Sequence, residues 1–459
     1  METTYEKRAL GGKISLTAIL LLLTLLTACS SAAVPTRGTA ASDAANTGAS
    51  SGQPYSSASS CIQSAVRAMA PSRVSSSSAA PVSPAAPAAA SSVASSSAKS
   101  SQRSSVSPST VTGKRILIGY YGSWDAYTGF TPDKINVRQI NTINYAFVSV
   151  GSDYKLRLSD SATDQSNFAK LRRLKAANPG LKVVLAVGGW DDSGEFSAAA
   201  ATQQARNTFA GSCADFLRSY GLDGINIDWE YPCSGGKTQG SPSDKANFTL
   251  LLQAVRGSLN TLGSSTGEHY ILSIAGGGSS SYVKNVELSR LGSILDYAVI
   301  MTYDIHGPWD SFADLNAPLY EISGSPQSEW SVDDSVKCWL GAGFPSGKLL
   351  LGVPYYGYIY SGVTDRNNGL FQRFSSAASV GYDTIVSRYE GASFTRNFLS
   401  QALVPTLFNG SVFISYDDSA SLAKKARYAV SKGLGGVSAW ELGYDKSGVL
   451  TNSVYNNLN

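Results

Sequence analysis

The chain has 459 residues, of which 43% are hydrophobic and 10% aromatic, so one large or two medium domains with a sizeable core are expected and general disorder is excluded. Its 37 basic and 33 acidic residues give a net charge of +4, which is too mild to predict a nucleic-acid partner. The 2 histidines, His269 and His306, leave little material for a metal site or a Ser-His-Asp triad, and we expect no metal and no other cofactor. The 5 cysteines are atypical of a disulfide-stapled scaffold.

The first 29 residues have the pattern of an export signal. Basic residues precede an apolar run from Ile14 to Leu26 that is too short for an ordinary membrane span. The segment that ends at Cys29 resembles the bacterial lipobox, in which the cysteine is lipidated. A plain signal peptide cleaved near Ala33 remains the alternative. Either interpretation predicts a secreted protein, and the first adds a lipid anchor in the cell envelope.

Residues 30–112 are rich in Ser, Ala and Pro, and no aromatic residue lies between Tyr55 and Tyr120. Such a composition cannot bury enough apolar surface to offset the entropy of ordering the chain. It also lacks the aromatic side chains of a sugar-binding module. We therefore expect a flexible linker over 30–112 and a folded domain over 113–459.

From Lys114 onward, short apolar runs alternate with amphipathic helical stretches, which is typical of a parallel sheet covered on both faces. The helical segments are 168–177, 201–220, 243–262, 331–340 and 421–432. The expected strands are 115–121, 140–150, 181–188, 223–230, 270–276, 295–303, 349–356 and 435–440. Eight such units favour a closed (β/α)₈ barrel over a doubly wound sheet, and the absence of a glycine fingerprint after the first strand agrees.

The connection between the seventh and eighth strands is longer than a barrel unit needs. It covers about 357–415, is rich in tyrosine and phenylalanine, and contains its own β-like run at 411–415. We expect a small α+β subdomain inserted at the barrel rim.

The fourth expected strand carries the chemistry. Along 223–230 the side chains alternate between faces, so Ile225, Ile227 and Trp229 are expected to pack outward against helices. Asn226, Asp228 and Glu230 then point into the barrel, where acidic side chains are costly unless they stand at the catalytic mouth.

Two acids separated by one residue raise each other's pKa, which can keep one protonated near neutral pH as a general acid. The alternatives are a buried ionic cluster and a metal site. No histidine joins the two acids, and Asn226 lowers the charge, so the metal site is disfavoured.

These residues resemble a known family. The segment 223–230, followed by Tyr231-Pro232, closely resembles the Asp-Gly-x-Asp-x-Asp-x-Glu signature of family 18 glycoside hydrolases, the chitinases. The resemblance extends over nearly all of 114–459. It includes the segments 143–147, 186–190, 301–309, 352–357, 414–418 and 435–441.

The resemblance implies hydrolysis of chitin or chito-oligosaccharides with retention, assisted by the C2 acetamido group of the sugar. Glu230 would be the acid and then the base, Asp228 would hold the acetamido N–H, and Tyr303 would aim the acetamido oxygen. Other residues expected at the substrate are Tyr120, Phe147, Asp223, Asn226, Met301, Asp304, Trp124, Trp190 and Trp440. Independently of the resemblance, Trp124, Trp190, Trp309 and Trp440 follow or end expected strands, where they can offer platforms to sugar rings.

The sequence departs from the family at Asn226, where a middle Asp is usual, at Ala186, where Ser is usual, and at Tyr358, where many members have Arg. The first departure puts the pH profile and the rate in doubt rather than the reaction. Two alternatives remain: an endo-β-N-acetylglucosaminidase acting on N-glycans, and a non-hydrolytic chitin-binding lectin. The lectin is disfavoured because such members usually lose the terminal Glu. We expect a monomer.

Overall fold

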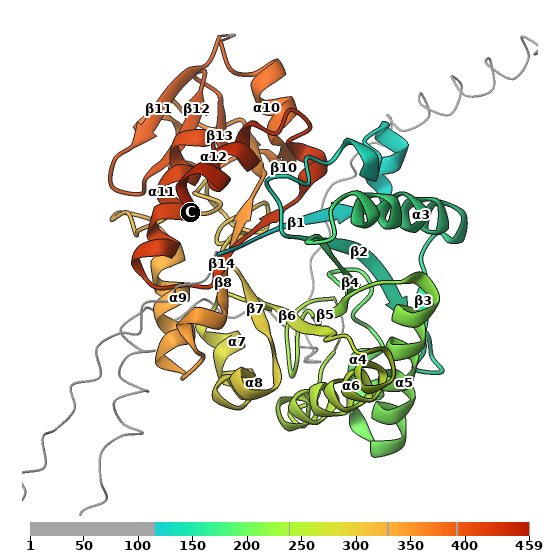
Figure 1. The fold of residues 1–459 in the computed structure, drawn as a ribbon. Helices are drawn as coiled ribbons and strands as arrows, with labels where there is room; N and C mark the ends of the chain where they lie inside the picture. The colour runs from blue at the N-terminus through green and yellow to red at the C-terminus, as the bar shows by residue number, and fades with distance from the viewer. Residues whose placement is uncertain (1–114, 238, 328–329, 392, 459) are drawn as a thin grey trace, which may run out of the picture. The chain divides into compact units, whose positions relative to one another are not determined.

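A computed structural model describes residues 115–458 apart from 238, 328–329 and 392 (Figure 1). The expected signal segment over 1–29, including Cys29, and the expected linker over 30–112 lie outside the described residues. Within these residues, no helix has the length and apolar character needed to span a bilayer.

Eight parallel strands close into a barrel, which confirms the expected (β/α)₈ fold (Figure 1). The barrel strands are β1 Ile116–Gly122, β2 Thr142–Val150, β4 Lys182–Gly188, β5 Gly224–Asp228, β6 Ile271–Gly277, β7 Tyr297–Met301, β8 Leu349–Pro354 and β14 Gly436–Trp440. The ring closes because β1 pairs with β2 on one side and with β14 on the other. A short strand, β3 Leu156–Leu158, adds antiparallel to β2.

Helices surround the barrel (Figure 1). The outward side chains of its strands lie in the core between strands and helices. The helices are α3 Ser161–Ala177, α4 Phe196–Ala201, α5 Gln203–Tyr220, α6 Asp244–Thr266, α7 Ser280–Asn285, α8 Leu288–Ile294, α9 Val332–Gly341, α11 Ser419–Ser431 and α12 Val449–Leu458. Trp229, just past β5, shows how this works: its ring stacks on Phe196 of α4 at 5.5 Å and meets the edge of Phe248 of α6 at 5.3 Å. The expected outward face of β5 is therefore confirmed.

The barrel interior is filled in layers. One buried layer is apolar and contains Ile118, Tyr297, Val299 and Leu350. Two residues further along β1, Tyr120 packs with Ala146 and Ala186 in a second cluster, against which Phe147 and Trp440 are partly buried. Because this second cluster lies toward the carboxyl ends of the strands, the aromatic residues gather at the end where barrel enzymes place their active sites.

A second sheet stands between β8 and α11. Its strands are β9 Tyr356–Ser361, β10 Ser376–Gly381, β11 Thr395–Leu399, β12 Val404–Phe408 and β13 Val412–Ser415, with helix α10 Tyr382–Arg388. They pair antiparallel in the order β10-β9-β13-β12-β11 around a separate core that includes Tyr360 and Phe413. Because β9 begins only two residues after β8 ends, this α+β subdomain is attached at the catalytic end of the barrel.

Candidate active site

The carboxyl end of β5 holds two acids at the barrel mouth. Asp228, the last residue of the strand, is 4% exposed, and Glu230 is partly exposed two residues later. Ser193, from the loop after β4, fixes the chain between them. Its hydroxyl accepts a hydrogen bond of 2.9 Å from the Glu230 N–H and lies 3.2 Å from the Asp228 carbonyl oxygen. Sequence reasoning missed Ser193, because its role depends on which strands are neighbours.

Burial is the main cause of the shifted pKa of Asp228. Its pKa is raised well above the usual value by loss of solvation and, secondarily, by the negative charge of Glu230. Its Oδ1 is buried without a hydrogen-bond partner among the described residues. The second acid therefore raises the pKa of Asp228 as expected, and burial by the surrounding protein raises it further. An unsatisfied buried oxygen is ready to receive a donor from a bound ligand.

Glu230 has the protonation behaviour of a general acid. Burial raises its pKa to about 7, the negative charges of Asp304 and Asp191 act in the same direction, and a hydrogen bond with Tyr231 opposes them. A carboxyl group with a pKa near neutral pH can give a proton to a leaving group and take one back from water in the next step.

Asn226 lies below the two acids and is fully buried. Its Oδ1 accepts a hydrogen bond of 2.9 Å from the Tyr120 hydroxyl, and its Nδ2 donates one of 3.0 Å to Ser273 Oγ. Both polar groups of this amide therefore pair with residues on other strands rather than with Asp228. Asn226 is a structural link across the barrel and leaves Asp228 free for a ligand.

The end of β7 supplies further predicted site residues. Met301 ends the strand, and Tyr303 and Asp304 follow it, with Tyr303 edge-on to Tyr356 at 6.0 Å. Asp304 has a left-handed backbone with φ of 56°, which an aspartate tolerates better than most residues. Its Oδ1 accepts hydrogen bonds from the hydroxyls of Tyr356 and Tyr358 on β9, the latter at 2.6 Å. The inserted sheet therefore completes the site.

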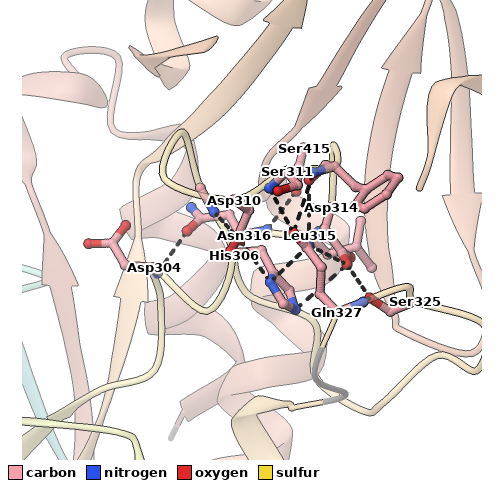
Figure 2. Close-up of polar contacts among 12 residues, drawn as sticks. Asp304, His306, Asp310, Ser311, Asp314, Leu315, Asn316, Ser325, Gln327 and Ser415 are labelled. Carbon is pink, nitrogen blue, oxygen red and sulfur yellow. Dashed lines mark hydrogen bonds and ion pairs between the residues drawn. The ribbon is translucent and has the colours of Figure 1, made fainter. Parts of the chain in front are cut away.

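A polar network anchors the loop that follows Asp304. Asn316 accepts the Asp304 N–H at its Oδ1, 2.9 Å away, and its own N–H donates to Ser415 Oγ of β13 at 2.8 Å. The buried His306 lies between two carboxylates, with Nδ1 2.9 Å from Asp310 and Nε2 3.6 Å from Asp314. Figure 2 shows the Asp304 carboxylate pointing away from this network while its backbone is tied to it. Asn316 was not recognised in the sequence, and Ser415 was noted only as part of the segment 414–418, since only the fold brings the two residues together.

Aromatic rings gather at the mouth around Trp440, which ends β14. Its ring lies 5.3 Å from Tyr120, 5.6 Å from Phe147 and 6.2 Å from Trp124. Three further tryptophan faces are open to solvent: Trp124 is 39% exposed, Trp190 48% and Trp309 59%. Such exposed rings beside a polar site are typical of proteins that bind the apolar faces of sugars.

Asp223 does not join this group. It precedes β5 at the amino end of the strand, where its Oδ2 accepts the Val183 N–H at 2.7 Å and pairs with Lys175 at 2.7 Å. Lys182 lies 3.7 Å from its other oxygen. The prediction that Asp223 binds substrate is corrected, because the length of the strand separates it from the mouth; it ties neighbouring barrel units together instead.

Comparisons with known proteins agree with this geometry. The model of the family described as glycosyl hydrolases family 18 matches residues 116–445. Chitinase A1 of Niallia circulans is 36% identical over 402 residues, covering 74% of this chain and 58% of that protein. Chitotriosidase-1 of Mus musculus is 32% identical over 344 residues, covering 72% of this chain and 73% of that protein.

Among solved structures, a family 18 N-acetylglucosaminidase from Paenibacillus barengoltzii superposes with a TM-score of 0.70 at 34% identity, covering 75% of this chain and all of that one. The chain therefore spans a little over half the length of one curated relative and the whole of a solved catalytic chain. The match to the family model, the identity to relatives and the acids at the barrel mouth lead to one conclusion. The chain belongs to the glycosyl hydrolases of family 18.

Proposed function

We propose that the protein is a chitinase, which hydrolyses the β-1,4 bonds between N-acetylglucosamine units with retention at the anomeric carbon. The observation that carries the proposal is the presence of two acids of different exposure at the end of β5. Glu230 is partly exposed with a pKa raised to about 7, beside the more deeply buried Asp228. Exposed tryptophans around this pair suit an uncharged polysaccharide, and two curated relatives bear the names chitinase and chitotriosidase.

In the proposed reaction the nucleophile belongs to the substrate. Glu230 protonates the glycosidic oxygen while the acetamido oxygen of the sugar attacks its own anomeric carbon, which breaks the bond and forms an oxazolinium ion. Glu230 then takes a proton from the water that opens this ring. Only one carboxyl group is required as acid and base, and the partial exposure of Glu230 allows it to reach both leaving group and water.

Asp228 and Tyr303 hold the acetamido group in this scheme. The unpartnered Oδ1 of Asp228 accepts the acetamido N–H and stabilises the positive charge that develops on it. The Tyr303 hydroxyl donates a hydrogen bond to the acetamido oxygen and aims it at the anomeric carbon. Such positioning replaces a bimolecular attack with an intramolecular one, which supplies a large part of the acceleration. Met301 and Asp304 line the same subsite, and Trp440 stacks beneath the sugar.

The deciding experiment offers the purified protein three substrates: crystalline chitin, soluble chito-oligosaccharides and an N-glycosylated glycoprotein. We expect release of oligosaccharides from the first two, with the β-anomer appearing first by NMR, and none from the third. Release from the glycoprotein alone would replace the proposal with the endo-β-N-acetylglucosaminidase. Binding to chitin without any release would indicate the lectin. Glu230→Gln is the matched control for background hydrolysis.

The location and state of the protein are also proposals. The apolar run before Cys29 supports export, and the lipobox-like segment supports attachment to the cell envelope. Full-length protein should partition into detergent, and Cys29→Ser should return it to the aqueous phase. Equal partitioning of the two forms would leave an ordinary signal peptide. The proposed catalytic unit, 113–459, should be active as a monomer without the preceding linker.

A further inference from the structure

The backbone of Glu230 lies beyond the hydrogen-bonded part of its strand. Within the described residues, the pairing of β5 with β4 and β6 ends at Asp228, opposite Gly188 and Ala275. Glu230 follows two residues later, so strand pairing does not fix its position. A general acid must nevertheless lie within hydrogen-bond reach of the oxygen that it protonates. The chain therefore needs another contact that holds Glu230 at the barrel mouth.

Ser193, in the loop after β4, provides that contact. It is 2% exposed, and its Oγ accepts the backbone N–H of Glu230 at 2.9 Å. The same hydroxyl lies 2.8 Å from the Gly189 carbonyl oxygen and 3.2 Å from that of Asp228. Because a hydroxyl has one proton and two lone pairs, it can donate to the nearer carbonyl while it accepts from Glu230. One side chain thus closes the turn 189–193 and ties it to the acid.

Asp228 is held independently of this hydroxyl. Its carbonyl oxygen accepts the Gly189 N–H at 2.8 Å. Gly188 lies so close that a β-carbon on it would be 2.4 Å from the same oxygen. Removing the Ser193 hydroxyl would therefore leave the end of β5 attached to the loop, whereas the Glu230 N–H would lose the acceptor that the structure gives it. The two acids should respond differently to one substitution.

We infer that Ser193 is a positioning residue that aligns Glu230 with the glycosidic oxygen. It acts through the Glu230 backbone and takes no part in proton transfer. The inference rests on the proposed function, because that function makes Glu230 the general acid. Its consequence is selective: without the hydroxyl, bond cleavage that depends on a proton from Glu230 should be slowed, and cleavage that needs no proton should not.

Two substrates with the same sugar separate these cases. Phenyl β-chitobioside has a poor leaving group that needs a proton, whereas 2,4-dinitrophenyl β-chitobioside releases a stable anion without one. Both leaving groups are single aromatic rings, so their contacts with the tryptophans at the mouth should differ little. The value of kcat/KM, which reports the first bond cleavage, is measured for both substrates with the wild type and with Ser193→Ala.

Ser193→Ala should lower kcat/KM about 10- to 100-fold on the phenyl glycoside, the range expected when a general acid is misplaced, and less than about threefold on the dinitrophenyl glycoside. Ser193→Cys, whose sulfur accepts hydrogen bonds only weakly, is the second variant and should show the same selectivity. Ser197→Ala is the matched control, because that hydroxyl donates to Asp244 Oδ1 at 2.7 Å and contacts neither acid; both values should stay unchanged. Equal losses of Ser193→Ala on the two glycosides would overturn the inference.

The Glu230→Gln background gives a second test. With no acid left to position, adding Ser193→Ala should cause no further loss on the phenyl glycoside, so the two substitutions should be strongly non-additive. A further loss as large as that in the wild type would show that Ser193 does not act through Glu230, and the inference would fail.

A readout without sugar keeps the inference distinct from the proposed function. Hydrogen exchange of the Glu230 amide should be about tenfold faster in Ser193→Ala, while that of the Gly189 amide, which is bound to Asp228, should change little. If the wild type cleaves neither glycoside and this difference is present, the proposed function fails and the hold of Ser193 on Glu230 stands. If both glycosides are cleaved and the Glu230 amide exchanges equally in the two proteins, the inference fails and the proposed function stands.

Discussion

The Tyr120 hydroxyl reaches across the barrel interior to Asn226, donating a hydrogen bond of 2.9 Å from β1 to β5. The Asn226 amide in turn donates a hydrogen bond of 3.0 Å to Ser273 Oγ of β6. Both ends of this amide are thus occupied by other residues, and Asp228 Oδ1 keeps no hydrogen-bond partner within the part of the chain that the structure describes. Asn226, one of the positions at which the sequence departs from its family, is therefore an uncharged link between strands.

Asn226→Asp tests what that neutrality does. The new carboxylate can still accept from Tyr120, and the Ser273 hydroxyl can rotate to donate to it, so the fold should survive. The added negative charge on the face shared with Asp228 and Glu230 should raise the pKa of both acids. We expect the profile of kcat/KM against pH to move to higher pH, with a change in kcat and a smaller change in oligosaccharide affinity.

The control for this variant is Ser273→Ala, which removes one hydrogen bond of Asn226 without adding charge. It should lower stability slightly and leave the pH profile in place. Overlapping profiles for Asn226→Asp and the wild type would show that the two acids do not respond to charge at this position.

Glu230→Gln should lower kcat by at least about 10²–10⁴-fold, the usual contribution of a general acid, because the amide keeps the shape but has no proton to donate. Affinity for chito-oligosaccharides, measured by calorimetry, should change little. A variant that retained half the wild-type rate would contradict the role given to Glu230.

The pH dependence of the wild type should follow the raised pKa of Glu230. As a general acid Glu230 must be protonated, so kcat/KM should be full below about pH 7 and fall about tenfold per pH unit above it. Asp304→Asn removes a negative charge that raises this pKa, so the fall should begin at lower pH.

Asp215→Asn is the matched control for Asp304→Asn. Asp215 pairs with Arg218 on the exposed side of α5, with its side chain 70% exposed, so its charge is screened from the site. The profile of kcat/KM against pH for Asp215→Asn should coincide with that of the wild type. An unchanged midpoint in Asp304→Asn would mean that Asp304 does not act on Glu230 electrostatically.

A buried ion pair should dominate the stability of the region around α11. Lys425 Nζ lies 2.6 Å from Asp417 Oδ2, and both side chains are 1% exposed. Lys425→Met leaves a buried carboxylate alone and should lower the free energy of unfolding in urea by about 3–5 kcal/mol at pH 7. Adding Asp417→Asn should restore much of the loss.

Lys432→Met provides the comparison, since Lys432 pairs with Asp333 at 3.1 Å but is 37% exposed. Lys432→Met should lower the free energy of unfolding by less than about 1 kcal/mol. Equal costs for the two lysine variants would show that burial of the Asp417 pair contributes nothing.

The barrel could be predicted from the sequence because most strands are largely apolar runs and most connections between them contain a helix. The inward face of β5 followed from alternation alone, so Asp228 and Glu230 were found without any knowledge of their neighbours. The resemblance to the family placed Asp223 at the substrate as well, although it precedes the strand and only the carboxyl end of a strand reaches the mouth. Alternation gives the face of a side chain but not its height in the barrel.

Residues that act through tertiary contacts could not be found in this way. Ser193 and Asn316 lie in loops with no periodic pattern, and their hydrogen bonds join segments that the sequence does not connect. Within the inserted sheet only one β-like run was recognised, because most of the other strands are short and partly polar.

Closure of the barrel between β1 and β14 has a consequence for the newborn chain. Ile116 pairs with Gly436, so the two strands that seal the ring are separated by nearly the whole domain. Until the ribosome has released β14, β1 and β8 each present an open edge, and open edges recruit other strands. Closure of the ring therefore waits for the last barrel strand, and until β14 emerges the growing chain keeps two strand edges that can pair with other chains.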